Sequence, residues 1–158
     1  MSEVELTVPV DVNVPAGVLW WRVTDWARQG EWMLGTRVTV TAGDGRSVGS
    51  RLAAFTGLGP VGFTDPMELV EYVEGGPWRA VVAHTGKLVR GHGVFEVVEL
   101  GPTRCRLLWT ELLELPPGAL GRAGWPLVRP ALRAGVAQSL RKLARLCEAE
   151  HRARGTMP

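Results

Sequence analysis

Four ionisable side chains lie in otherwise apolar, alternating stretches of the sequence, and their residue types are suited to proton chemistry. They are Arg51, Asp65, His84 and Glu111. An imidazole, whose ordinary pKa is near 6.5, exchanges protons at neutral pH, and a carboxylate accepts them. A buried charge is costly unless it is paired or hydrogen-bonded. We therefore expect these groups either to pair with one another as structural hydrogen-bonders or to meet a polar group of a ligand.

The alternation of side chains along a strand predicts which of these residues face the interior. In residues 104–111 two arginines mark one face, so Trp109 and Glu111 are expected on the other, buried face. The same alternation places His84 inside, although a bulge at Asp65-Pro66 would turn Asp65 outward. The further positions expected to face inward on two other strands are Arg51, Phe55, Phe63, Asp65 and Met67.

The elements that must position these residues follow from periodicity and turn residues. Strands are expected where side chains alternate between glycine- and proline-containing turns, and two short helices are expected within 16–33. A C-terminal apolar stripe at three- and four-residue steps predicts a helix of about six turns. Pro126 and Pro130 predict a bend before it, after a short helical turn around 120–125. The expected strands are 3–12, 36–40, 47–56, 61–74, 78–85, 87–100 and 103–115.

This order of elements predicts an α+β domain over residues 1–152, followed by a loose tail over 153–158. Its seven-stranded, curved antiparallel sheet would wrap around the long C-terminal helix, with two short helices after the first strand. A single helix does not cover such a sheet completely, so we expect an interior space suited to an apolar ligand. The 7 tryptophans would either line this space or fill the core.

The composition argues against several classes of function. A formal net charge of +2 gives little support for nucleic-acid binding. The histidines, acids and 2 cysteines show no metal-ligand spacing, so neither a metal site nor a cofactor is expected. Basic residues are concentrated in the last quarter, where they form either the solvated face of a helix or a contact with anionic lipid. No apolar run is long enough to span a membrane and no signal peptide is recognisable, so a cytoplasmic protein without stable membrane insertion is expected.

Short motifs spread along nearly the whole chain carry a resemblance to a known family. They are Val18-Leu19-Trp20, Thr24-Asp25-Trp26, Glu31-Trp32-Met33, Phe63-Thr64-Asp65, His84-Thr85-Gly86, Val89-Arg90-Gly91, Trp109-Thr110-Glu111 and the stretch from Leu120-Gly121-Arg122 to Pro130. With these, the chain resembles the START-like superfamily, and within it the small actinobacterial polyketide cyclase/dehydrase proteins. The resemblance implies the helix-grip fold and a hydrophobic cavity that opens between the long helix and the loops of the sheet.

The resemblance implies ligand binding in that cavity but does not by itself imply an enzyme, so two functions stay open. The first is noncatalytic binding of a lipid, aromatic or polyketide-like molecule, in a carrier or sensor role. The second is an aromatase/cyclase-dehydratase activity, in which His84 moves protons and Glu111 orients it or acts as a base. Arg51 or Arg129 would then stabilise a developing enolate oxygen. The residues expected to contact the ligand are Trp32, Arg51, Phe55, Phe63, Asp65, Met67, Trp109, Trp125 and Arg129.

A third reading, from the residues alone, is an interaction module that pairs through the sheet edge. Pro9 in the first strand weakens such pairing, because proline lacks the N–H that a neighbouring strand would need. A monomer or a homodimer is expected.

Overall fold

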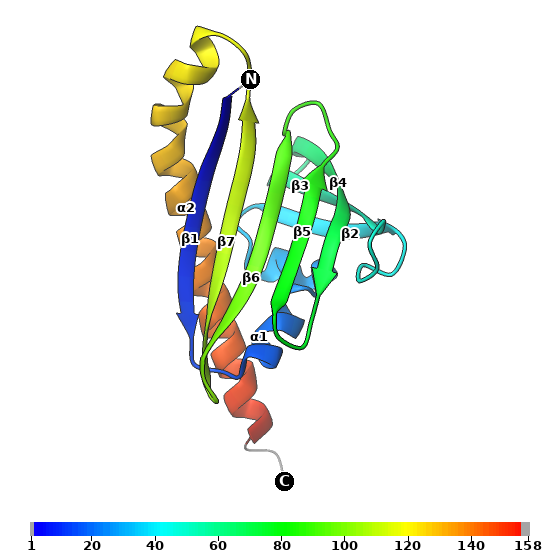
Figure 1. The fold of residues 1–158 in the computed structure, drawn as a ribbon, viewed down its shortest axis with the longest axis vertical. Helices are drawn as coiled ribbons and strands as arrows, with labels where there is room; N and C mark the ends of the chain where they lie inside the picture. The colour runs from blue at the N-terminus through cyan, green and yellow to red at the C-terminus, as the bar shows by residue number, and fades with distance from the viewer. Residues whose placement is uncertain (1, 156–158) are drawn as a thin grey trace.

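The chain forms one antiparallel sheet with its helices on one side (Figure 1). The computed structural model describes residues 2–155, with only the backbone at positions 119 and 120. The first half contains β1 (Ser2–Val12), α1 (Ala16–Val23), the 3₁₀-helix η1 (Trp26–Glu31), β2 (Thr36–Ala42), β3 (Arg51–Leu58) and β4 (Val61–Val73). The second half contains β5 (Trp78–His84), β6 (Gly91–Gly101), β7 (Arg104–Leu115) and α2 (Ala119–Gly155).

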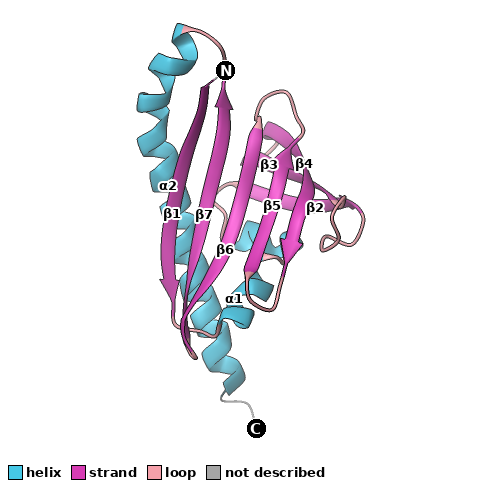
Figure 2. Cartoon of the chain, in the orientation of Figure 1, coloured by secondary structure: helices cyan, strands magenta, loops and turns pink. Residues whose placement is uncertain are grey.

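The sheet has seven strands in the order β1-β7-β6-β5-β4-β3-β2, and every neighbouring pair is antiparallel. Strands β2 to β7 form a meander, and β1 joins it beside β7 (Figure 2). Because consecutive antiparallel strands run in opposite directions, their connections alternate between the two ends of the sheet. The η1–β2, β3–β4, β5–β6 and β7–α2 connections therefore share one end. The predicted α+β fold with seven antiparallel strands and a long C-terminal helix is confirmed.

The predicted break before the last helix is wrong. Helix α2 is continuous over 37 residues and contains both Pro126 and Pro130. Each proline lacks the N–H that would bond to the carbonyl four residues earlier. The residues whose carbonyls lose this bond are Arg122 and Pro126, and both are exposed, so the interruption lies at the surface of the molecule. Residues 153–155, expected to belong to a loose tail, are also helical, whereas residues 156–158 lie outside the described part.

The core lies between the sheet and the helices. The predicted apolar stripe of α2 is buried there at Val136, Leu140, Leu143 and Cys147. Helices α1 and η1 cover the same side of the sheet, and Trp20 of α1 is fully enclosed. In the described part of the chain, no helix combines the length and the apolar character that crossing a bilayer requires.

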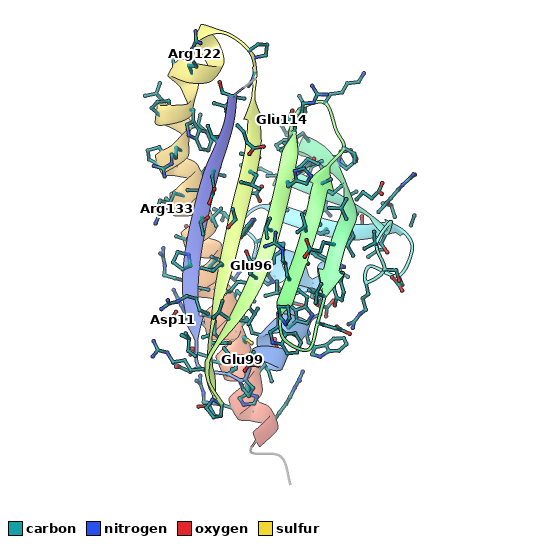
Figure 3. The ribbon with its side chains drawn as sticks, viewed as in Figure 1. Asp11, Glu96, Glu99, Glu114, Arg122 and Arg133 are labelled. Carbon is teal, nitrogen blue, oxygen red and sulfur yellow. The ribbon has the colours of Figure 1, made fainter. Side chains whose placement is uncertain are left out.

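The opposite face of the sheet is charged. Figure 3 labels Asp11 on β1 and Glu96 on β6, and Glu96 forms an ion pair with Arg79 of β5 on the face turned away from α2. Asp11 accepts hydrogen bonds of 2.6 Å from Arg104 and from Arg106 of β7. These arginines face outward as their alternation predicts, and the residues between them face inward.

Candidate binding cavity

A cavity of about 420 Å³ lies between the inner face of the sheet and α2. Most of its walls are apolar, and strands β2 to β7, η1 and α2 all contribute to them. The apolar side chains that form the walls include Val38, Leu52, Val82, Phe95, Leu132 and Val136. A volume of this size falls within the range of small-molecule sites, so the tryptophans and leucines of the core do not fill the interior.

The cavity reaches the surface beside α2. Two of its lining side chains are also exposed to solvent, Leu34 by 60% and Phe63 by 40%. Leu34 follows η1, Phe63 lies near the start of β4, and Ala131 of α2 is the exposed helical residue of the lining. These three segments border an opening at the end of the sheet where the η1–β2 and β3–β4 connections lie.

One polar cluster interrupts the apolar walls. The His84 ring lies between two carboxylates, with Nδ1 2.7 Å from Asp65 Oδ2 and Nε2 3.3 Å from Glu111 Oε2. Trp109 Nε1 donates a hydrogen bond of 2.6 Å to the other oxygen of Glu111. The His84, Asp65 and Glu111 side chains are 7%, 10% and 15% exposed. The predicted inner polar groups Asp65, His84 and Glu111 therefore pair with one another.

The cluster holds a proton strongly. Burial by itself lowers the pKa of His84, because it disfavours the charged imidazolium. The hydrogen bonds to Asp65 and Glu111, together with their negative charges, outweigh burial and raise the pKa from 6.5 to about 9. At neutral pH the His84 ring is an imidazolium that donates both of its N–H groups to carboxylates.

Strand register brings the three residues together. His84 of β5 pairs with Met67 of β4, two residues beyond Asp65 on the same face. The bulge of β4 lies between Leu69 and Glu71 rather than at Asp65-Pro66, so Asp65 stays on the inner face. The anticipated outward turn of Asp65 therefore does not occur.

A residue that the sequence reasoning missed leaves room for the carboxylate. Gly93 of β6 pairs with Glu111 on one side and with Val82 on the other. A Cβ at this position would lie 3.1 Å from Val82 Cγ2 and 3.4 Å from Glu111 Oε1. A glycine in the middle of a strand was the available signal, since glycine there often marks a close approach.

Most of the predicted contact residues lie in or beside the cavity. Phe63, Asp65, Met67 and Trp109 line it, together with His84 and Glu111. Trp32 is buried behind the wall, where its ring packs edge-on against that of Trp109 with centroids 6.1 Å apart. Their contacts with a ligand remain a prediction.

Trp125 lies beside the cavity rather than in it. It lines a neighbouring groove of about 340 Å³ at the same end of the sheet, together with Leu88 and Val128. Val89 and Leu113 line both the groove and the cavity, so the two are adjacent.

Three predicted residues point away from the cavity. Arg51 is exposed and Leu52, its neighbour, faces inward, so the inner assignment of Arg51 and Phe55 was wrong by one position. The ring of Phe55 lies on the outer face under the Arg37 guanidinium, 5.2 Å from the ring centroid. Arg129 is exposed on α2 and does not line the cavity. Neither arginine is placed to stabilise an oxyanion there.

Comparison with solved structures supports the fold. The chain is similar to the Zhui aromatase/cyclase from Streptomyces sp. R1128, with a TM-score of 0.81 and 12% identity over 99% of this chain and 100% of that one. It is similar to a point mutant of norcoclaurine synthase from Thalictrum flavum, with a TM-score of 0.70 and 15% identity over 96% and 97%. A START superfamily protein from Mycobacterium smegmatis aligns with a TM-score of 0.65 and 16% identity over 92% and 95%.

Comparison at the level of sequence identifies the family. None of the curated proteins matches the chain. Residues 3–148 match the family described as polyketide cyclase / dehydrase and lipid transport, which agrees with the resemblance of the short motifs. The matched segment contains every residue of the sheet except Ser2, and every residue of the Asp65–His84–Glu111 cluster. The chain therefore belongs to the polyketide cyclase / dehydrase and lipid transport family.

Proposed function

We propose that the protein binds an apolar small molecule in its cavity, in a carrier or sensor role. The observation that carries this proposal is a space of about 420 Å³ with mostly apolar walls and an opening beside α2. Transfer of apolar surface from water into such a space is favourable, by about 0.8 kcal/mol for each buried methylene group. A lipid, an aromatic compound or a polyketide-like molecule fits this description, and the family description includes lipid transport.

A homologous series of alkylphenols tests the proposal. Each added methylene should tighten binding about fourfold until the cavity is full, because about 0.8 kcal/mol corresponds to that ratio. The affinity can be measured by displacement of a hydrophobic fluorescent dye. Extraction of the purified protein with organic solvent, followed by mass spectrometry, would identify a molecule carried from the cell.

Two tryptophan substitutions on α2 provide the matched control. Leu132 lines the cavity, so Leu132→Trp should fill part of it and weaken binding of the longer members of the series. Leu127 is 80% exposed and lies outside the cavity, so Leu127→Trp should leave binding unchanged. An affinity that does not depend on chain length, or an equal loss in both variants, would contradict binding in the cavity.

A second candidate function is a cyclase or dehydratase reaction in the same cavity, because a titratable cluster in an apolar pocket is a common feature of active sites. The geometry changes the role expected of His84. Both of its nitrogens are occupied by carboxylates, so it serves to position and charge-balance Glu111, which becomes the better candidate for a base. If His84→Gln and Glu111→Gln together leave product formation from a poly-ketone unchanged, this function is excluded.

Location and assembly remain part of the proposal. We expect a cytoplasmic protein that acts as a monomer or homodimer and does not bind nucleic acid. Sedimentation velocity of the purified protein measures its oligomeric state. Fluorescence anisotropy with a labelled duplex oligonucleotide measures nucleic-acid binding, and binding that survives physiological salt would contradict the expectation.

A further inference from the structure

The polar groups in the cavity restrict the chemistry of the ligand, provided that the ligand binds there as proposed above. We propose that the polar end of the ligand is a hydrogen-bond donor, a hydroxyl group or a protonated amine, and that the Glu111 carboxylate accepts it. A ligand whose polar end is a ketone, ether or carboxylate would be the wrong partner. The proposal depends on which donors and acceptors of the cavity are already engaged.

The donors of the polar cluster are all engaged within it. The His84 nitrogens face Asp65 and Glu111, and the Trp109 N–H is donated to Glu111. These donors are engaged whether the shared proton is on His84 or on Glu111. An imidazolium donates at both nitrogens, and a neutral ring would instead accept from a protonated Glu111, so the shared proton stays inside the cluster. No donor of the cluster is left for a ligand oxygen.

The hydroxyl groups of the walls are engaged as well. The Thr36 hydroxyl donates to the Leu34 carbonyl at 3.2 Å and lies 3.1 Å from the Thr56 hydroxyl, which is then the donor of that pair. Ser139 donates to the Gly135 carbonyl at 3.0 Å and accepts the N–H of Leu34 at 3.0 Å. All three hydroxyl protons of these cavity residues are therefore used inside the protein.

The remaining lining donors belong to η1. Trp26 donates its indole N–H to the Gly45 carbonyl at 2.7 Å, and the Gln29 amide nitrogen donates to the Val23 carbonyl at 2.8 Å. One amide hydrogen of Gln29 remains, on a different element from the polar cluster. The buried Trp32 N–H has no partner among the described residues, but Trp32 does not line the cavity. Neither arginine nor lysine is among the described lining residues.

Free acceptor capacity, in contrast, is concentrated at Glu111. Each of its oxygens accepts one hydrogen bond and retains a second lone pair. Glu111 is the most exposed member of the cluster, at 15%. Asp65 Oδ1 has no partner among the described residues, but the atom is closed off from solvent, which leaves Glu111 as the receiving group. Two carboxylates and one imidazolium also carry a net negative charge, which repels an anionic ligand and attracts a cation.

Matched probes separate the two kinds of polar end. A 4-alkylphenol and the corresponding 4-alkylanisole share the ring and the chain, but only the phenol donates a hydrogen bond. Because a hydrogen bond to a charged acceptor contributes about tenfold or more in affinity, the phenol should bind the wild-type protein at least about tenfold more tightly. The matching alkylamine should behave like the phenol, and the matching alkylcarboxylate should bind most weakly. Comparison of phenol and amine then identifies which donor the site prefers.

Two glutamine variants test whether Glu111 causes the preference for a ligand that donates a hydrogen bond. Glu111→Gln adds a donor to the site, so it should reduce the ratio of phenol to anisole affinity and improve binding of an alkyl ketone. Glu99 is exposed on β6 outside the cavity, so Glu99→Gln should keep the wild-type ratio. Circular dichroism verifies that both variants are folded, and the wild-type series stands without them.

The outcomes distinguish this inference from the proposed function. If phenol and anisole bind with equal, length-dependent affinity, the donor requirement is overturned and binding in the cavity stands. If no member of any series binds, the donor requirement and the proposed binding in the cavity are both contradicted. If the phenol preference survives in Glu111→Gln, Glu111 is not the receiving group and the inference is wrong.

Discussion

The Asp65–His84–Glu111 cluster predicts that the protein loses stability between neutral pH and pH 9. The cluster raises the pKa of His84 from 6.5, the value expected in the unfolded chain, to about 9 in the folded protein. A group whose pKa is higher in the folded state binds its proton more tightly there. Its stabilisation is therefore complete below pH 6.5 and is lost as the pH rises through 9.

The size of the effect follows from the same two values. Each tenfold difference in proton affinity corresponds to about 1.4 kcal/mol, so the rise in pKa from 6.5 to about 9 corresponds to about 3 to 4 kcal/mol at most. His84 titrates in both the folded and the unfolded state, and the difference between the two curves gives the loss at each pH. About two thirds of the stabilisation, about 2 kcal/mol, is lost between pH 7 and pH 9. The His84 side chain is only 7% exposed, so solvent screening reduces the effect little.

Urea unfolding of the wild type and of His84→Gln over this pH range measures the effect. Glutamine does not titrate in this range, so the variant lacks the contribution of the His84 imidazole. The wild-type free energy of unfolding should therefore fall by about 2 kcal/mol more than that of the variant. In the unfolded chain the two cysteine thiols begin to titrate near pH 9, but they do so in both proteins and their contribution cancels in the comparison. Parallel pH dependences would refute the ion-paired arrangement of His84.

Three other regions allow direct predictions. Gly91→Ala should disrupt the pairing of β6 with β7, seen as a loss of soluble protein or of the cooperative transition, because φ is +121° and a Cβ would collide with the Leu112 carbonyl. Leu107→Ala should lower the free energy of unfolding by about 2–5 kcal/mol in urea titrations, because this fully buried side chain leaves a cavity. Cys105 and Cys147 should react with a thiol reagent at pH 8 only after unfolding, because burial raises their pKa values to about 11 and about 12.

The strands whose two faces differ in composition were predictable from the sequence. On β7 the outward arginines Arg104 and Arg106 fix the alternation, and Trp109 and Glu111 follow on the inner face. On β3 the two faces are similar, because small alanines lie on both and each carries a large apolar side chain, Leu52 on the inner face and Phe55 on the outer face. What holds Phe55 there is the Arg37 guanidinium of the neighbouring strand, a contact between strands that no local pattern contains.

The candidate site was predictable as a set of inner residues but not as a network. Alternation places Asp65 and His84 on the inner face, yet their 2.7 Å contact depends on the register of β4 against β5. That register depends on a bulge five residues from Asp65, which leaves no clear mark in the sequence. The occupation of both His84 nitrogens, and with it the raised pKa, follows only once the distances are known.

The pairing of β1 with β7 has a consequence for how the chain folds. This pair joins Val12 to Cys105, which are 93 positions apart, and its other end joins Ser2 to Leu115. During synthesis β1 leaves the ribosome long before the strand that will cover its edge, so its backbone groups stay without a strand partner until β7 has emerged. Because contacts between such distant segments require a large loop to close, the sheet should complete late, on the millisecond-to-second scale typical of β-rich topologies.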